Sequence, residues 1–280
     1  MSDLRSLLVH LDASPRCIER LRLAHGLASA FGARATAMYG VMPAVLLGAY
    51  GLAEGAAAAY PLLGETDAEQ RAATRRLFER ERGDGNAPLA WADLGMEPVL
   101  QRLSVEALYA DLLVLGQYDP GDALVATVPP DLVPTVLLNS GKPGLVVPYA
   151  GDFTSIGQQV LVAWKPTRES ARAVSTALPL LKKARTVHLA LAEAAEDETR
   201  IEGGLDLVHW LNTHGIEPQV HRSSVATDTP GESLLSLAAD LSADLLVMGC
   251  YGHSRARELM LGGASRTVLR SMTLPVWMSH

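Results

Sequence analysis

The feature that most constrains the fold is an internal repeat, because the two halves of this 280-residue chain carry the same pattern of residues. Each half opens on a short apolar run that ends in a turn and a hydroxyl residue, and each later carries the same Ala-Asp-Leu-Leu-Val motif ending in glycine. A repeated pattern marks a repeated structural unit, and this length suffices for two cores. The matched segments are 6–14 with 159–167, 110–116 with 243–249, and 142–148 with 273–278.

Within each half, runs of Val, Leu and Ala alternate with longer stretches of helical period. Such runs are typical of strands that crossover helices cover on both faces. The predicted fold is α/β: two tandem doubly wound, Rossmann-like domains, each with a five-stranded parallel sheet flanked by helices. The expected domains are 1–150 and 157–280, with a polar, glycine-bearing linker at 150–157. The expected strands are 6–11, 34–41, 88–93, 111–116, 144–147, 159–164, 185–191, 216–222, 244–249 and 275–278. The expected helices are 15–31, 67–83, 97–109, 167–183, 199–213, 231–241 and 264–271.

Charge and cysteine content exclude several classes of partner. The formal charge is −7, and no cluster of Lys and Arg stands out, which argues against nucleic acid or an anionic membrane as a main partner. Cys17 and Cys250 lie in unrelated contexts, so neither a disulfide framework nor a structural zinc site is expected. The N-terminal residues lack the pattern of a secretory signal. A cytoplasmic protein without a metal site is the expectation.

A glycine-bearing segment follows the strand predicted at 244–249. Gly249 and Gly252 come first, and Gly262 and Gly263 follow after nine intervening residues, before a predicted helix. Glycine permits φ > 0 turns and lets phosphate oxygens approach backbone N–H groups, and a helix N-terminus adds favourable dipoles. Ligands of doubly wound sheets bind beyond the carboxyl ends of the strands. The segment therefore predicts an anion site, with phosphate as the expected ligand.

These residues resemble the G-x2-G-x9-G-[ST] signature of the universal stress protein family, and the flanking strands agree. The resemblance implies a cytoplasmic stress-response protein in which an adenine nucleotide, ATP or a related molecule, is a structural or regulatory ligand. One position departs from the family, because Gly263 stands where nucleotide binders usually carry Ser or Thr. Ser265 is the nearest hydroxyl. The resemblance also implies that the two copies pack as an internal pseudo-dimer through their last strands.

The two copies differ in complementary ways. The first keeps Asp12 after its first strand, where the family's nucleotide binders usually carry aspartate, but its loop reads Gly116-Gln117-Tyr118-Asp119-Pro120. A carboxylate would repel phosphate there, and proline removes an N–H donor, so this copy is not expected to bind a triphosphate. The second copy has the glycines, but Lys165 replaces the aspartate. Its ammonium would either contact phosphate or stay a solvated surface group.

The nucleotide site is therefore expected in the C-terminal domain. Besides the glycines, Met248 and Leu191 at strand ends would contribute backbone groups by the family pattern, and His253 would orient phosphate unless its loop is simply exposed. The full set is Lys165, Leu191, Met248, Gly249, Gly252, His253, Gly262, Gly263, Ala264 and Ser265. The other histidines, His188 and His221 among them, are expected to be ordinary packing or surface residues.

No catalytic residue is expected, because no nucleophile, base and metal-holding carboxylate form a set in the sequence. Two alternatives stay open: a ligand-free interaction protein in which both sites are vestigial, and a weak ATP hydrolase. The first copy also carries an apolar segment, residues 42–63, broken by Gly, Pro and Glu54. It is expected to be a lid or a subunit contact rather than a membrane span, and a homodimer would use this surface.

Overall fold

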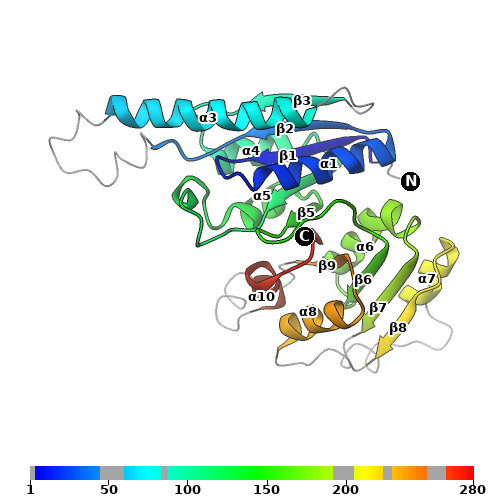
Figure 1. Ribbon diagram of the computed structural model, residues 1–280. Coiled ribbons are helices and arrows are strands. Elements are labelled where there is room, and N and C mark those ends of the chain that lie inside the picture. The colour runs from blue at the N-terminus through cyan, green and yellow to red at the C-terminus, as the bar shows by residue number, and fades with distance from the viewer. Residues whose placement is uncertain (1–3, 45–59, 83–87, 192–204, 223–228, 251–262) are drawn as a thin grey trace. The chain divides into compact units, whose positions relative to one another are not determined.

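The computed structural model describes residues 4–44, 60–82, 88–191, 205–222, 229–250 and 263–280 (Figure 1). The chain divides into two compact units, one of Leu4–Lys142 and one that contains Pro143–His280. Both are α/β, as predicted, and every expected strand is present. None of the helices within the described ranges is both long and apolar enough to cross a membrane.

The described residues of the first unit form four parallel strands in the order β3-β2-β1-β4. The strands are almost wholly buried at the centre, where the buried positions of β1 and β4 are leucine and valine around His10. Helices between successive strands provide the crossover connections that parallel pairing requires. The strands are β1 (Ser6–Leu11), β2 (Arg34–Tyr39), β3 (Leu89–Asp93) and β4 (Leu112–Gly116), and the helices are α1 (Cys17–Phe31), α3 (Tyr60–Arg82), α4 (Val99–Ala107), the 3₁₀ turn η2 (Val125–Thr127) and α5 (Leu132–Ser140).

In the part of the second unit that the structure describes, six strands lie in the order β5-β10-β9-β6-β7-β8. Five of them pair in parallel, whereas β5, the last strand of the first repeat, pairs antiparallel with β10, the last strand of the second. The strands are β5 (Gly144–Val147), β6 (Gln159–Trp164), β7 (Thr186–Leu191), β8 (Gln219–Arg222), β9 (Leu245–Gly249) and β10 (Val276–Ser279), and the helices are α6 (Arg168–Leu181), α7 (Leu207–Thr213), α8 (Pro230–Asp240) and α10 (Ala264–Ser271).

Two helices differ from the expectation. Helix α5 lies in a segment for which no helix was predicted, because its prolines obscure the helical period. Pro134 is its third residue, where no intrahelical N–H bond is lost. Helix α3 begins at Tyr60, so the last residues of the apolar 42–63 segment form its first turn. The rest of that segment from residue 45 lies outside the described residues, as does the predicted start of α7.

The repeat extends to individual hydrogen bonds. The Asp111 carboxylate, just before β4, accepts bonds of 2.9 Å from the backbone N–H groups of Arg5 and Ser6 at the start of β1. Asp244, just before β9, accepts three such bonds, of 2.9 to 3.1 Å, from residues 157–159 at the start of β6. The aspartate of the repeated motif therefore fixes the amino ends of the first strand in each repeat.

Candidate functional site

The carboxyl edge of the second unit holds the start of the predicted site. Strands β9, β6 and β7 are parallel neighbours, so their carboxyl ends lie along one edge of the sheet. Met248 and Gly249 end β9, and Leu191 ends β7. Lys165 directly follows β6 and is exposed. The fold thus gathers these predicted residues at one edge, which is where an open α/β sheet binds ligands.

Gly249 is required because helix α6 packs directly against the end of β9. A Cβ on this residue would lie 2.5 Å from the backbone nitrogen of Ser170 and 2.7 Å from the carbonyl carbon of Glu169. Thr167 caps the same helix, and its hydroxyl accepts a 3.3 Å hydrogen bond from the Ser170 N–H. The amino end of α6 therefore sits at the carboxyl end of β9.

Helix α10 begins where it was predicted, at Ala264, with Gly263 at its N-cap. Ser265 lies in its first turn and is 4% exposed. The remaining predicted residues, Gly252, His253 and Gly262, lie outside the described residues, so the phosphate-binding role of the segment between β9 and α10 stays a prediction.

Sequence reasoning missed Glu169, whose side chain is 4% exposed beside Gly249. Although burial opposes its ionisation, hydrogen bonds from Arg168, from its own backbone N–H and from the Thr167 hydroxyl hold the pKa of this carboxyl below its ordinary value. An anion in the first turn is stabilised by the helix dipole. The Glu169 carboxylate therefore already occupies part of the anion-attracting start of α6. The signal in the sequence was an acidic residue in the first turn of the predicted helix.

The corresponding edge of the first unit is filled by an ion pair. Arg20, on α1, places its NH2 group 2.7 Å from Oδ2 of Asp12, and its Nε donates to the His10 carbonyl at 3.0 Å. The two charged side chains are 6% and 8% exposed. A Cβ at Gly116 would collide with the Arg20 guanidinium, so this group lies directly on the end of β4. The Asp12 carboxylate is thus paired within the chain, and its other oxygen accepts the Ser14 N–H at 2.9 Å.

The sequence did not indicate the role of Arg20 either. In the register that matches residues 6–14 to 159–167, its counterpart is Ala173, which is fully buried and carries no charge. The repeats therefore differ in more than their loops, because a guanidinium occupies the edge of the first sheet and a methyl group stands at the same position in the second.

Two histidine interactions were not foreseen either. His10 is buried and its Nε2 lies 2.8 Å from the Gly40 carbonyl oxygen; burial lowers its pKa and keeps the ring neutral. His188 and His221, on neighbouring strands, face each other with 3.0 Å between Nδ1 and Nε2, and burial followed by the proximity of His221 lowers the pKa of His188. Within the described ranges, no group of three or more potential metal ligands occurs.

Both cysteines are free thiols and 1% exposed. Burial raises the pKa of Cys17 to about 12, which leaves it protonated and unreactive at neutral pH. Trp277 is fully buried on β10 and donates a 3.1 Å hydrogen bond to Thr176, and Trp91 stacks on Tyr39 in the first unit.

Comparisons with known proteins agree with this architecture. Residues 158–280 match the family model described as the universal stress protein family. Universal stress protein Slr1230 of Synechocystis sp. is 42% identical over 45 residues, which are 16% of each chain. A universal stress protein from Archaeoglobus fulgidus is 18% identical, with a TM-score of 0.68 over 97% of this chain and 94% of that one. A putative universal stress protein from Pseudomonas aeruginosa gives 16% identity and a TM-score of 0.58 over 98% and 92%.

The two solved structures show the same fold along nearly the whole chain, in agreement with two tandem α/β units. The family model adds sequence evidence for the second unit, where the glycine-bearing segment lies. Residues 158–280 therefore form a domain of the universal stress protein family.

Proposed function

We propose that this protein is a cytoplasmic stress-response protein that binds an adenine nucleotide, ATP or a related molecule, in its C-terminal domain. The observation that carries the proposal is the contrast between the two carboxyl edges. In the first unit, the Arg20–Asp12 ion pair covers Gly116 and engages the carboxylate that family members use near the nucleotide. In the second unit, Ala173 stands at the position of the arginine, and the atoms nearest to Gly249 belong to Glu169 and Ser170 instead of a guanidinium.

The groups available in the C-terminal domain suit a phosphate-bearing ligand. Met248, Gly249 and Leu191 provide backbone groups at the carboxyl edge, and Lys165 provides an ammonium beside them. Gly263 at the N-cap of α10 leaves the first-turn N–H groups of that helix without a side-chain cap. Gly252, His253 and Gly262 would complete the phosphate contacts, as the family signature implies.

The test is to identify small molecules carried by the freshly purified full-length protein, by mass spectrometry after denaturation, and to measure its thermal shift with ATP. We expect an adenine nucleotide or a rise in melting temperature with ATP. Gly252→Asp should abolish either result, because it adds a carboxylate at the expected phosphate position. Gly121→Asp is the matched control in the first repeat, where only the Asp119 side chain lies near the new Cβ, and it should leave binding unchanged.

A ligand-free interaction protein is the second candidate, and Glu169 favours it. Its buried carboxylate beside Gly249 would repel a phosphate placed at the start of α6. If nucleotide binds despite this charge, Glu169→Gln should tighten binding. If the site is vestigial, neither the native protein nor this variant should respond to any nucleotide, and pull-downs should recover a stable protein partner.

We further propose that the protein is not an enzyme, apart from slow ATP hydrolysis at most. The proposal predicts no turnover on the time scale of a metabolic ATPase. Rapid magnesium-dependent phosphate release that is lost on replacement of His253 or Lys165 would instead establish a hydrolase. Cell fractionation tests the cytoplasmic location, for which the two free thiols are the supporting observation.

A further inference from the structure

The outward face of helix α3 carries a charge pattern that is complementary to itself. Glu65, Glu69, Arg76 and Arg80 are all exposed, together with Ala72 and Ala73. At 100° per residue, these six positions fall within an arc of about 100° along one side of the helix. The acidic pair and the basic pair lie at equal distances on either side of the Ala72–Ala73 peptide bond.

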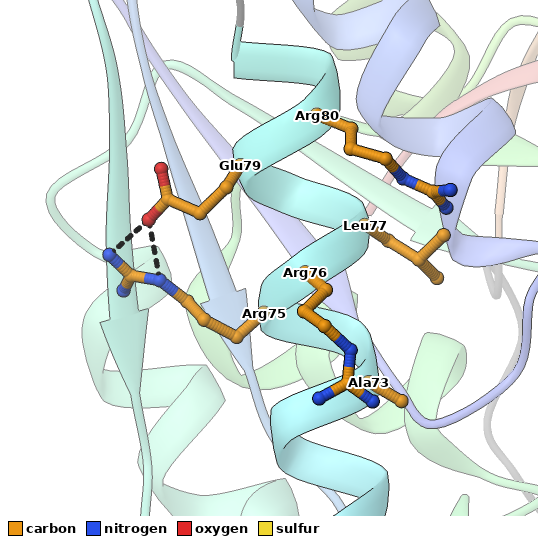
Figure 2. A pocket seen from close by; sticks show the side chains of 6 residues that line it. All are labelled: Ala73, Arg75, Arg76, Leu77, Glu79 and Arg80. Carbon is orange, nitrogen blue, oxygen red and sulfur yellow. Dashed lines mark hydrogen bonds and ion pairs between the residues drawn. The ribbon is translucent and has the colours of Figure 1, made fainter.

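The opposite side of α3 is fixed within its own unit. Thr74 and Phe78 are buried, and the Phe78 ring meets Trp91 of β3 edge-on with centroids 5.3 Å apart. Figure 2 shows Arg76, Leu77 and Arg80 leaving the helix on one side and the Arg75–Glu79 ion pair on the other. The outward face is therefore held in place by the packing of the inward one.

The chain pairs the other nearby arginines but not these two. Arg75 bonds Glu79, Arg71 lies 3.2 Å from Asp93, and Arg22 on α1 makes a two-bond contact with Glu81. In the described parts of the chain, none of the four charged residues of the outward face makes an ion pair or a side-chain hydrogen bond. Their charges thus remain available to a partner.

We propose that this face binds the same face of a second copy of the chain, with the two α3 helices antiparallel across a two-fold axis at Ala72–Ala73. In this arrangement Glu65 meets Arg80 of the other copy and Glu69 meets Arg76, and each pairing occurs twice. A parallel arrangement would place like charges opposite each other. A two-fold contact requires a patch that complements itself, and this pattern meets that requirement.

The shape of the outward face of α3 also suits the proposed antiparallel pairing. Alanines at the centre let two helix axes approach to about 8 Å, the close end of the usual range. Ala73, Arg76, Leu77 and Arg80, with Arg75 and Glu79, line a hollow of about 550 Å³ that would receive side chains of the other helix (Figure 2). From residue 65 to residue 80 the face is about 22 Å long. A helix pair of this length lies at the low end of specific interfaces, so the dimer is weak and depends on concentration.

Charge exchange tests the pairing in the full-length protein by sedimentation velocity over a range of concentrations. Arg76→Glu with Arg80→Glu makes an all-acidic face, and Glu65→Arg with Glu69→Arg makes an all-basic face. Each variant alone should raise the dimer dissociation constant at least about tenfold. An equimolar mixture of the two should form a heterodimer, and the fourfold variant that carries all the exchanges should dimerise like the native protein. Added salt should weaken every dimer.

The matched control is Arg16→Glu with Arg34→Glu, which makes the same charge change at exposed positions of the same unit outside α3. It should leave the dissociation constant unchanged. A second readout is oxidative cross-linking: Ala72→Cys lies at the axis and should form a disulfide-linked dimer. Leu62→Cys, whose native side chain is 65% exposed, should not, because two copies would lie about 30 Å apart, beyond the roughly 7 Å limit for a disulfide. The native cysteines are buried.

Three results would overturn the proposal. They are a native protein that stays monomeric at roughly millimolar concentration, an all-acidic or all-basic variant that dimerises as well as the native protein, and a mixture of these two variants that does not associate. Because each variant is read against its charge-exchanged partner, a fold defect in one variant is separated from loss of the interface by the fourfold variant.

Discussion

Replacing Arg20 should destabilise the N-terminal unit far more than an arginine replacement usually does. Arg20→Met keeps a side chain of similar length but removes the guanidinium that pairs with Asp12 at 2.7 Å and donates to the His10 carbonyl at 3.0 Å. The Asp12 side chain is 8% exposed, so its charge would be left buried and unpaired. Breaking a buried pair from one side costs about 3–5 kcal/mol.

A double replacement separates this cost from the value of the ion pair itself. Asp12→Asn combined with Arg20→Met removes both charges, and replacing both members of a buried pair is often close to neutral. The double variant should therefore recover most of the stability that Arg20→Met loses. Arg22→Met is the matched control on the same helix, because its guanidinium is 52% exposed, and it should change stability by less than about 1 kcal/mol.

Hydrogen exchange followed by mass spectrometry is the appropriate assay, because it reports on each unit separately. Amides of β1 and β4 should exchange about 10²- to 10⁴-fold faster in Arg20→Met, which corresponds to the expected free-energy change, while amides of β6 and β9 serve as an internal reference. An increase below about tenfold, equivalent to about 1.4 kcal/mol, would refute the reasoning. A double variant no more stable than Arg20→Met would refute it as well.

Three further results are expected. His10 has a native pKa below its unfolded value, so the native state binds fewer protons than the unfolded state. The contribution of His10 to stability should therefore be fully present above about pH 6.5 and should fall below that pH by at most about 1.4 kcal/mol per pH unit. Urea midpoints measured across pH should show a flatter profile in His10→Gln. Asp244→Ala should cost about 2 kcal/mol in urea unfolding, because three backbone N–H groups lose their acceptor; no loss would mean that water replaces the carboxylate. Gly249→Ala should reduce the free energy of unfolding by about 1–3 kcal/mol and so lower the melting temperature, because its Cβ meets a backbone atom. Gly26→Ala, with open space around the new Cβ, should raise the melting temperature.

The sequence predicted the fold class and the strands well because strands buried on both faces leave continuous apolar runs. The apolar runs by themselves could not show that β5 pairs antiparallel with β10, since such a run carries no information on direction; the pairing of the last strands was implied by the family resemblance. Prolines hid α5, although one near a helix start is compatible with helix. Tyr60 lies in an apolar stretch whose composition did not indicate where α3 begins.

For the candidate site, the sequence predicted only the positions that follow from where the strands end. Lys165, Leu191, Met248 and Gly249 were placed at one edge because parallel strands end together. The roles of Arg20 and Glu169 depend instead on where long side chains reach across neighbouring elements. Spacing along the chain does not encode that reach, so neither residue was distinguishable from a solvated charge.

The antiparallel contact between β5 and β10 determines where the chain can be divided. A fragment that starts at residue 158, the first position matched by the family model, would leave one edge of β10 without its neighbour and expose unpaired backbone groups of an apolar strand. A fragment that starts at Pro143 keeps that neighbour and follows the division between the compact units. Isolated preparations of the C-terminal half should therefore be less prone to aggregation when they begin at Pro143 than when they begin after the linker.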